Sequence, residues 1–368
     1  MAIVGIIANP ASGKDIRRLV AYGSVFDNQE KVNIVRRVLL GLEAAGVNEA
    51  IFMPDYFGIG PRAVDGARLS MQTSILDMPL RATQEDSTQA AALMREMGVG
   101  CIVTIGGDGT NRAVAKGCGD VSLMPISTGT NNVFPYMIEG TIAGLAAGVV
   151  ASGTFDSRRL ARRTKRLEVK LDGRLIDIAL VDAVVYADLF VASRAIWDMS
   201  KVKEIILTRA EPDNIGLSSV GGNLYCARFN RHHGVYIRLG EGPLEVTAPI
   251  APGLIGSVGI AGYKLLSIGD QVEVAYRPSL LALDGEREIE IGKDDEMSIQ
   301  LSATGPLVVD VRRALQCAAK ANLFTRLWGG ESMRKRCAMR EANLCLAPLD
   351  SCLALLPKAR DAKHERRE

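Results

Sequence analysis

The sequence has little of what would mark an exported protein or a metal centre. Its seven cysteines are odd in number and form no CxxC pair, which argues against a disulfide framework and a zinc site. Its three histidines are an adjacent pair, His232-His233, and His364 near the C-terminal end. Neither a Ser-His-Asp triad nor a histidine-ligated metal is therefore indicated. A cytoplasmic protein in a reducing environment is expected.

Charge of one sign and long apolar runs are also scarce. The formal net charge is +2 with 23% charged residues, which excludes a global basic field for nucleic acid. The apolar stretch 141–151, with a GxxxGxxxG pattern at Gly140, Gly144 and Gly148, is far shorter than the ~20 residues that span a bilayer. It predicts a buried helix packed closely on a neighbour rather than a transmembrane segment. The N-terminus, MAIVGIIANP, has no basic region or cleavage site and predicts a first strand.

The first half of the chain predicts a doubly wound α/β domain over residues 1–155. A chain of 368 residues with 48% hydrophobic content suits two domains with a cleft between them. Apolar runs alternate with segments of helical spacing, as a parallel sheet with crossover helices requires. The predicted strands are 2–8, 101–105 and 121–126, and the predicted helices begin near Asp27 and Thr83 and end at Gly46 and Gly98.

The second half predicts an antiparallel β-sandwich over residues 156–311. Apolar residues there alternate with charged ones, and Asp172-Gly173 is typical of a hairpin turn. A helix over 312–324 is expected to pack back on the first domain. The basic stretch 326–368 predicts a mobile, solvated tail.

The segment Gly106-Gly107-Asp108-Gly109-Thr110 follows a predicted strand and opens a helix. Glycines permit close approach by a polyanion, and a helix N-terminus offers free N–H groups and a favourable dipole. A carboxylate in a bare phosphate cradle would repel the ligand, so Asp108 indicates a general base or a magnesium ligand. A simple Asp-Gly turn is the alternative, and the five-residue context disfavours it.

Two other loops follow predicted strands. The loop 9–14, NPASGK, is not a Walker A loop, because Ala8 stands in place of the first glycine and Asp15 in place of the Ser or Thr after the lysine. The loop 127–132, STGTNN, offers hydroxyls and amides, which either cap a helix or hold phosphate oxygens or a ribose. Three such loops along one sheet edge favour ligand binding.

A fourth element, Asp284-Gly285-Glu286, lies between two predicted strands. The same dipeptide occurs at Asp172-Gly173 in a similar hairpin, so Asp284-Gly285 by itself predicts no more than a turn. A turn does not account for Glu286, so the presence of this residue needs a separate explanation.

Together, NPASGK, GGDGT, GTNN and DGE in this order resemble the NAD kinase and diacylglycerol kinase superfamily. The segment 83–112 is most similar to the ATP-NAD kinase branch that includes acetoin-catabolism protein X. The likeness extends from Asn9 to about Leu323. It implies a doubly wound N-terminal domain, a β-sandwich C-terminal domain, ATP and Mg²⁺ as cofactors, and transfer of the γ-phosphoryl group to an alcohol.

The resemblance also implies roles for individual residues, while metal ligands stay unassigned. Asp108 and Glu286 match the catalytic acidic residues, and either could deprotonate the acceptor or orient magnesium. Substrate binding is assigned to Asn132, Asp182 and Asp284. The residues expected to bind ATP are Asn9, Ser12, Gly13, Lys14, Gly106, Gly107, Gly109, Thr110, Thr128, Gly129, Thr130 and Asn131.

The sequence departs from NAD kinases where these grip the adenosine ribose with an Asn-Glu pair. The similar stretch here, 179–183, reads ALVDA, and the later glycine loop reads SSVGGN over 218–223. Three acceptors therefore stay open: NAD, a small metabolite such as one in acetoin breakdown, and a lipid. A nucleotide-sensing module without turnover is the non-enzyme alternative. The expected partners are a nucleotide and a small molecule, with homo-oligomerisation left open.

Overall fold

The computed structural model describes residues 1–13, 22, 26–187, 199–225 and 232–325, without the side chains of 286–288. Lys14 and the predicted tail over 326–368 lie outside these residues. Contacts divide the chain into Met1–Gln316 and Cys317–Glu368, with helix α8 (Val311–Lys320) running across the division. The first unit holds all three sheets. The packing of the helix predicted over 312–324 stays a prediction.

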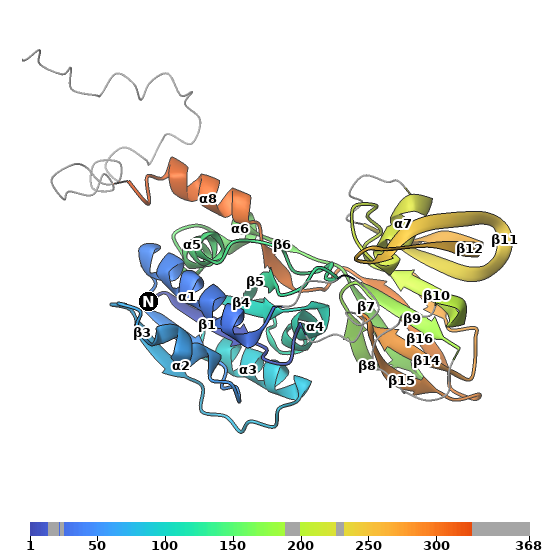
Figure 1. Ribbon diagram of the computed structural model, residues 1–368, viewed down its shortest axis with the longest axis horizontal. Coiled ribbons are helices and arrows are strands. Elements are labelled where there is room, and N and C mark those ends of the chain that lie inside the picture. Colours follow the sequence, from blue (N-terminus) through green and yellow to red (C-terminus); the bar gives the residue numbers. More distant parts are fainter. Residues whose placement is uncertain (14–21, 23–25, 188–198, 226–231, 326–368) are drawn as a thin grey trace, which may run out of the picture. The chain divides into compact units, whose positions relative to one another are not determined.

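The first sheet has seven strands in the order β3-β2-β1-β4-β5-β17-β6 (Figure 1). All neighbouring strands pair in parallel except β17 and β6, which are antiparallel. The three strands predicted in the first half are confirmed as β1, β4 and β5. The strand bounds are β1 Ile3–Ala8, β2 Glu49–Phe52, β3 Gln72–Ile75, β4 Cys101–Gly106, β5 Ser122–Ser127, β6 Ala161–Arg163 and β17 Leu307–Val309.

Helices connect these strands in the doubly wound manner. The chain moves one way from β1 to β3 and the other way from β4 to β5, so right-handed crossovers place helices on both faces. Asp27 caps α1 by accepting from the Glu30 N–H at 2.7 Å, and Thr83 and Asp86 form a capping box at α3. The helix bounds are α1 Asn28–Ala44, α2 Ile59–Val64, α3 Gln84–Glu96, α4 Asp108–Gly117, α5 Gly140–Ala151 and α6 Ser157–Leu160.

Helix α5 packs closely on α1, as its glycine pattern predicts. A Cβ at Gly144 would overlap the backbone carbonyl oxygen of Val38, and a Cβ at Gly41 would overlap that of Thr141. The glycines therefore bring the two helix backbones together. Among the helices within the described residues, none is long and apolar enough to cross a membrane.

We expect Gly144→Val to lower the free energy of unfolding by about 3 kcal/mol or more, the upper range for overpacking. A backbone oxygen such as that of Val38 cannot move aside by changing rotamer. Urea denaturation measures the change. The control Ile142→Val, at an exposed position of the same helix, should change the stability by no more than about 0.5 kcal/mol. Equal effects of the two substitutions would contradict the close helix contact.

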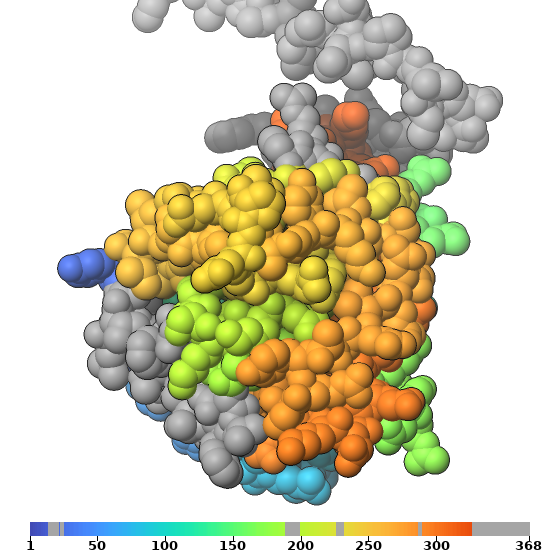
Figure 2. Space-filling model, turned by 90° about the vertical axis from the view of Figure 1, so that its right-hand side faces the viewer, coloured from blue at the N-terminus to red at the C-terminus, as the bar shows by residue number. Residues whose placement is uncertain are grey.

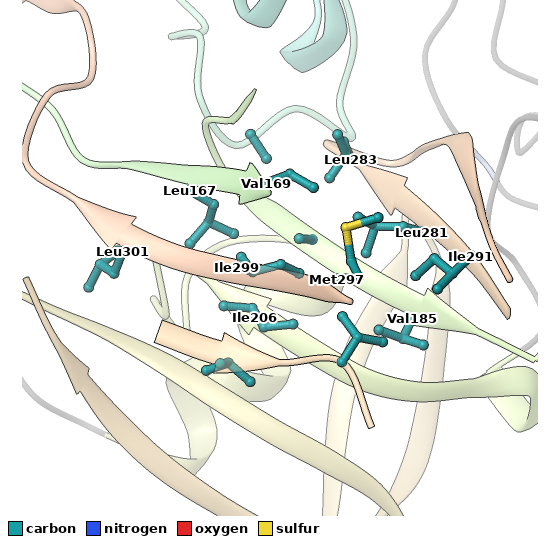
Figure 3. Packing of buried hydrophobic residues seen from close by; sticks show 14 of the residues in the cluster. Leu167, Val169, Val185, Ile206, Leu281, Leu283, Ile291, Met297, Ile299 and Leu301 are labelled. Atoms are coloured by element: carbon teal, nitrogen blue, oxygen red, sulfur yellow. The ribbon is translucent and has the colours of Figure 1, made fainter. Parts of the chain in front are cut away.

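The β-rich half consists of two sheets with a core between them. A six-stranded sheet has the order β12-β11-β10-β9-β14-β15, and a four-stranded sheet has the order β13-β16-β7-β8. Leu167, Val185, Leu281 and Ile299 come from both sheets and lie in one buried cluster (Figure 3). The predicted β-sandwich is therefore confirmed. The bounds are β7 Arg166–Leu171, β8 Arg174–Ala179, β9 Asp182–Tyr186, β10 Val202–Leu207, α7 Leu217–Leu224, β11 His233–Ala251, β12 Leu254–Ser267, β13 Gln271–Glu273, β14 Ser279–Leu283, β15 Glu286–Ile291 and β16 Met297–Ser302.

Two short strands near the predicted domain limits lie in the first sheet rather than in the sandwich. These are β6 and β17, which pair with each other next to β5. The limits of 155 and 311 stay predictions. At the outer side of the sandwich, the long hairpin of β11 and β12 (yellow to light orange) covers much of the face seen in Figure 2.

Both Asp-Gly dipeptides form hairpin turns. Asp172-Gly173 joins β7 to β8 with φ values of 49° and 76°, and Asp284-Gly285 joins β14 to β15 with φ values of 52° and 82°. The positive φ values are those of type I′ turns. Asp172 is exposed while Asp284 is buried, so the two side chains serve different purposes.

Candidate active site

The three loops marked by the sequence follow β1, β4 and β5, which are neighbours in the first sheet. Asn9 Nδ2 donates to Thr110 Oγ1 at 2.9 Å and joins the first loop to α4. Ser12 Oγ lies 3.2 Å from Thr128 Oγ1 and joins the first loop to the third. The structure therefore brings the three loops together at one sheet edge, where α/β proteins bind ligands.

The third loop lies directly against the glycines of the second. A Cβ at Gly107 would come within 2.8 Å of Asn132 Oδ1, so the Asn132 side chain would have to shift to admit one. Asn132 Nδ2 donates to Ser127 Oγ at 2.8 Å within its own loop. Thr128 and Gly129 are buried, and Thr130 is exposed.

Asn131 contributes an acceptor to the same loop. Its Oδ1 is buried, and within the part of the chain that the structure describes no hydrogen bond reaches it. Such an oxygen suits a hydroxyl or amino group of a bound nucleotide, because a buried acceptor costs free energy until it is bonded. Asn131 thus offers a buried acceptor to a bound group.

Asp108 is the first residue of α4, where the helix dipole favours a negative charge. Its Oδ1 accepts from the Phe134 N–H at 2.8 Å, and the Val133 N–H lies 3.1 Å from both carboxylate oxygens. These bonds hold the carboxylate in one orientation at the start of the helix.

Arg209, from the β-rich half, holds the other side of the same segment. Its guanidinium donates to the Val133 carbonyl oxygen at 3.0 Å and lies 4.8 Å from the centre of the Phe134 ring. Phe134 is fully buried in a small cluster with Leu180 and Val181. The segment bonded to Asp108 is thus fixed by both halves of the first unit.

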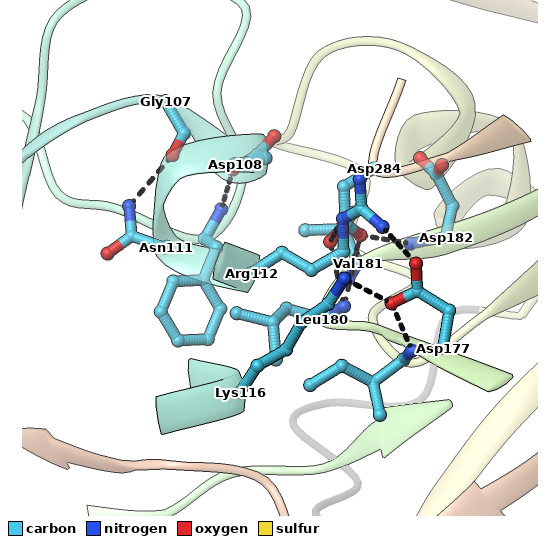
Figure 4. Close-up of polar contacts among 12 residues, drawn as sticks. Gly107, Asp108, Asn111, Arg112, Lys116, Asp177, Leu180, Val181, Asp182 and Asp284 are labelled. Carbon is cyan, nitrogen blue, oxygen red and sulfur yellow. Dashed lines mark hydrogen bonds and ion pairs between the residues drawn. The ribbon is translucent and has the colours of Figure 1, made fainter. Parts of the chain in front are cut away.

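Arg112 lies one helical turn after Asp108 and is fully buried (Figure 4). Its guanidinium lies 3.1 Å from Asp177 Oδ2 in β8 and 3.8 Å from Asp284 Oδ2 in the β14–β15 turn. Lys116 Nζ lies 2.7 Å from Asp177 Oδ1 and completes a chain of alternating charges. Helix α4 is therefore tied to the sandwich by charged groups on the side that carries Asp108.

Asp284 uses its carboxylate to hold backbone. The two oxygens accept from the N–H groups of Leu180, Val181 and Asp182 at 2.7 to 3.2 Å, around the corner between β8 and β9. Burial raises the pKa of Asp284 to about 7, although Arg112 lowers it, and the charge of Asp108 raises it further. The two carboxylates are thus close enough to interact.

The structure describes the other predicted acidic and basic residues only in part. Asp182 opens β9 with a buried side chain, and its carbonyl oxygen accepts from the Asp284 N–H at 3.0 Å. Glu286 is the first residue of β15, and its side chain is outside what the structure describes. Lys14 lies outside the described residues altogether. The structure therefore brings Asp108, Asp182 and Asp284 together (Figure 4) and leaves the other two as sequence-based expectations.

Sequence reasoning missed Lys31, Arg112, Asp177 and Arg209. A signal existed for Arg112, because a charge four residues after Asp108 shares its helix face. Lys31 and Arg209 had none, since a single cation on a predicted helix or after a strand is usually solvated. Within the described residues, no group of three or more His, Cys, Asp or Glu side chains is arranged to hold a metal ion.

Comparison with known proteins agrees with this architecture. Residues 4–154 match the ATP-NAD kinase N-terminal domain, and residues 165–304 match the acetoin catabolism protein X C-terminal domain. The chain is 38% identical over 341 residues to acetoin catabolism protein X of Cupriavidus necator, covering 88% of this chain and 94% of that relative. The chain belongs to the acetoin catabolism protein X family.

This family lies within the NAD kinase and diacylglycerol kinase superfamily, as the loop motifs indicate. Among solved structures, a putative diacylglycerol kinase from Bacillus anthracis str. Sterne aligns with 84% of this chain and 98% of its own. Its sequence identity is 14% and its TM-score 0.39.

Proposed function

We propose that this acetoin catabolism protein X relative is an ATP- and Mg²⁺-dependent kinase that phosphorylates a hydroxyl group. One observation carries the proposal: three glycine- and hydroxyl-bearing loops are hydrogen-bonded together at one sheet edge, with Asp108 opening the helix between them. Phosphoryl transfer asks mainly for positioning and for stabilisation of charge, and this set of groups can provide both.

In the proposed reaction the acceptor hydroxyl lies beside Asp108. Its oxygen bonds to the γ-phosphorus of ATP, the bond from that phosphorus to the β,γ-bridging oxygen breaks, and ADP leaves. The hydroxyl proton passes to the Asp108 carboxylate, which the Val133 and Phe134 N–H groups hold in one orientation. Glu286, two residues after the buried Asp284, is assigned to share this task, and Lys14 to hold a phosphate.

Magnesium, when bound with ATP, neutralises charge on the phosphates. In kinase sites it is bound by one or two carboxylates together with the phosphates, so a large cluster of acidic ligands is not required. Asp108, at the N-terminus of α4, is the described carboxylate that fits this requirement.

We propose NAD as the first acceptor to test, with NADP as the product. The match of residues 4–154 to an ATP-NAD kinase domain supports NAD, and the name of the relative from Cupriavidus necator supports a metabolite of acetoin breakdown. Against NAD stands the missing Asn-Glu pair, since a site that lacks its ribose partners should bind the ribose weakly. A lipid hydroxyl is the third acceptor.

The test is incubation of the pure protein with labelled ATP, magnesium and a panel containing NAD, small alcohols related to acetoin, and diacylglycerol. Acceptor-dependent ADP release with a labelled product is the expected result. Tight ATP binding with no product from any acceptor would favour a nucleotide-sensing module instead. The bonds from Asp108 to two N–H groups are the observation that favours this second function, because they give the carboxylate a structural use.

If NAD is the acceptor, we expect Asp182→Ala to weaken NAD binding more than it lowers kcat. Asp182 stands in the stretch that lacks the Asn-Glu pair, and its carboxylate could accept from a ribose hydroxyl. Loss of one hydrogen bond to a charged group should raise KM for NAD by about tenfold or more. The measurement is NADP formation from NAD and Mg-ATP. If no NADP appears while ADP is released with another alcohol, the NAD assignment fails.

A further inference from the structure

Lys31 is a buried charged residue that the proposed reaction leaves unused. It lies in α1, and its side chain is fully buried. Burying an ammonium group costs free energy unless hydrogen bonds replace its water shell. Four oxygens of the described residues lie within hydrogen-bond distance of its Nζ and share its three N–H groups: the carbonyl oxygens of Asn9 at 2.9 Å, Pro10 at 3.3 Å and Ser12 at 2.7 Å, and Asn28 Oδ1 at 3.0 Å. Three of the four belong to the first loop.

These contacts determine which way the peptide groups of that loop point. In a planar trans peptide the C=O and the N–H of one unit point in opposite directions. The carbonyl groups of Pro10 and Ser12 face Lys31, so the N–H groups of Ala11 and Gly13 point away from it. The Ala11 N–H donates to Asn9 Oδ1 at 2.9 Å, so the Gly13 N–H is the group we consider for a ligand. Gly13 has a φ of 74°, the left-handed conformation found in backbone turns that bind anions through N–H groups.

Electrostatic interactions favour the same orientation of these peptide groups. Carbonyl oxygens turned toward a polyphosphate would repel it, whereas here they are drawn to the opposite side by a fixed positive charge. The charge of Lys31 also reaches Asp55, which follows β2: burial raises the pKa of Asp55, and backbone hydrogen bonds and, to a smaller extent, Lys31 partly offset that rise.

We propose that Lys31 is the positioning residue of the first nucleotide loop. It holds the carbonyl oxygens of the loop inward and thereby directs the Gly13 N–H toward the phosphates of ATP. The inference rests on the proposed ATP-binding function. It assigns an effect on nucleotide affinity to a residue of α1 that no loop motif marks.

The first test measures Mg-ATP binding by titration calorimetry. Lys31→Met keeps the length of the side chain and removes the donors, so we expect Kd for Mg-ATP to rise about tenfold or more. Arg36→Met is the matched control, because Arg36 lies on the same helix and donates to the carbonyl oxygens of Arg62, Ala63 and Asp65 instead. The Kd of Arg36→Met for Mg-ATP should stay within about threefold of the wild-type value. A Lys31→Met protein that binds Mg-ATP as tightly as Arg36→Met would overturn the proposal.

The second test needs no nucleotide and separates this proposal from the proposed function. Hydrogen exchange over residues 9–13 should be faster in Lys31→Met than in the wild type, and unchanged in Arg36→Met. If the wild type does not bind Mg-ATP, the kinase proposal fails, and this exchange still decides whether Lys31 holds the loop. If Lys31→Met does not fold, Lys31→Gln, which keeps one donor group, replaces it in both tests. Unchanged exchange over residues 9–13 in a folded variant would refute the positioning role.

Discussion

Asp108→Asn is expected to lower the rate of phosphoryl transfer by about 10²–10⁴-fold, the usual cost of losing a general base. The amide oxygen can still accept from the Phe134 and Val133 N–H groups, which now hold the carboxylate at 2.8 and 3.1 Å. The fold should therefore remain, with a thermal midpoint close to that of the wild type. Steady-state ADP release, with the acceptor found in the panel, measures the rate.

The matched control is Asp172→Asn, which makes the same change at an Asp-Gly dipeptide in the β7–β8 hairpin. Asp172 is exposed and lies 3.3 Å from the Glu296 N–H at the far end of the sandwich sheet, so its loss should leave the rate unchanged. An Asp108→Asn protein that keeps more than about half of the wild-type rate would remove Asp108 from the chemistry, because that lies far outside the expected range. In that case Glu286 becomes the first candidate for the base.

The second large effect is expected on stability. Arg112→Met should lower the free energy of unfolding by about 3–5 kcal/mol, because breaking a buried ion pair leaves its partner uncompensated. The partners are Asp177 at 3.1 Å and Asp284 at 3.8 Å. Urea denaturation measures the loss. Arg163→Met, which removes an exposed partner of Asp120, is the control and should cost no more than about 1 kcal/mol.

The loss of unfolding free energy caused by Arg112→Met should also depend on pH. The pKa of Asp284 in the folded protein is about 7, well above the ordinary carboxyl value of about 3.9. The folded state therefore binds a proton at Asp284 more tightly than the unfolded chain does. The stability that this proton binding provides is lost as pH rises through 7. Without Arg112 the ionised Asp284 is uncompensated, so the destabilisation should be larger at pH 8 than at pH 5.

A double variant tests whether Arg112 acts through Asp284. In Arg112→Met/Asp284→Asn no buried charge remains at position 284, so the loss should be smaller than the sum of the two single losses. Strict additivity of the three measurements would mean that the two residues stabilise the fold independently. Helix α4 and the β14–β15 turn would then not be coupled through this pair.

The local elements were predictable because their signals are local. The cap at Asp27, the capping box at Thr83 and Asp86, and the left-handed glycines at 46 and 98 place helix ends without reference to the rest of the chain. The loops after β1, β4 and β5 could likewise be expected to meet, because parallel strands end at a common edge. Their contacts through Asn9, Ser12 and Thr128 agree with that expectation.

Asp284 illustrates what local signals miss. Its hairpin turn was readable from Asp284-Gly285, by comparison with Asp172-Gly173, yet the two carboxylates differ completely in use. Asp284 accepts backbone N–H groups that lie 102 to 104 residues away in the sequence, at the corner between β8 and β9. No pattern within the turn could indicate those partners, because they depend on how the sandwich strands are ordered.

The sequence by itself determined the architecture and the place of the candidate site. Hydrophobic periodicity, caps and glycines act over a few residues and so specify strands, helices and loops directly. Only the tertiary structure decided which charges are buried and what they hold: Arg112 between Asp177 and Asp284, and Lys31 against the carbonyl oxygens of the first loop. The physical reason is that a charged side chain has the same appearance in a sequence whether it is solvated or buried. Its burial, and hence its energetic weight, is set by partners that the fold brings from distant parts of the chain.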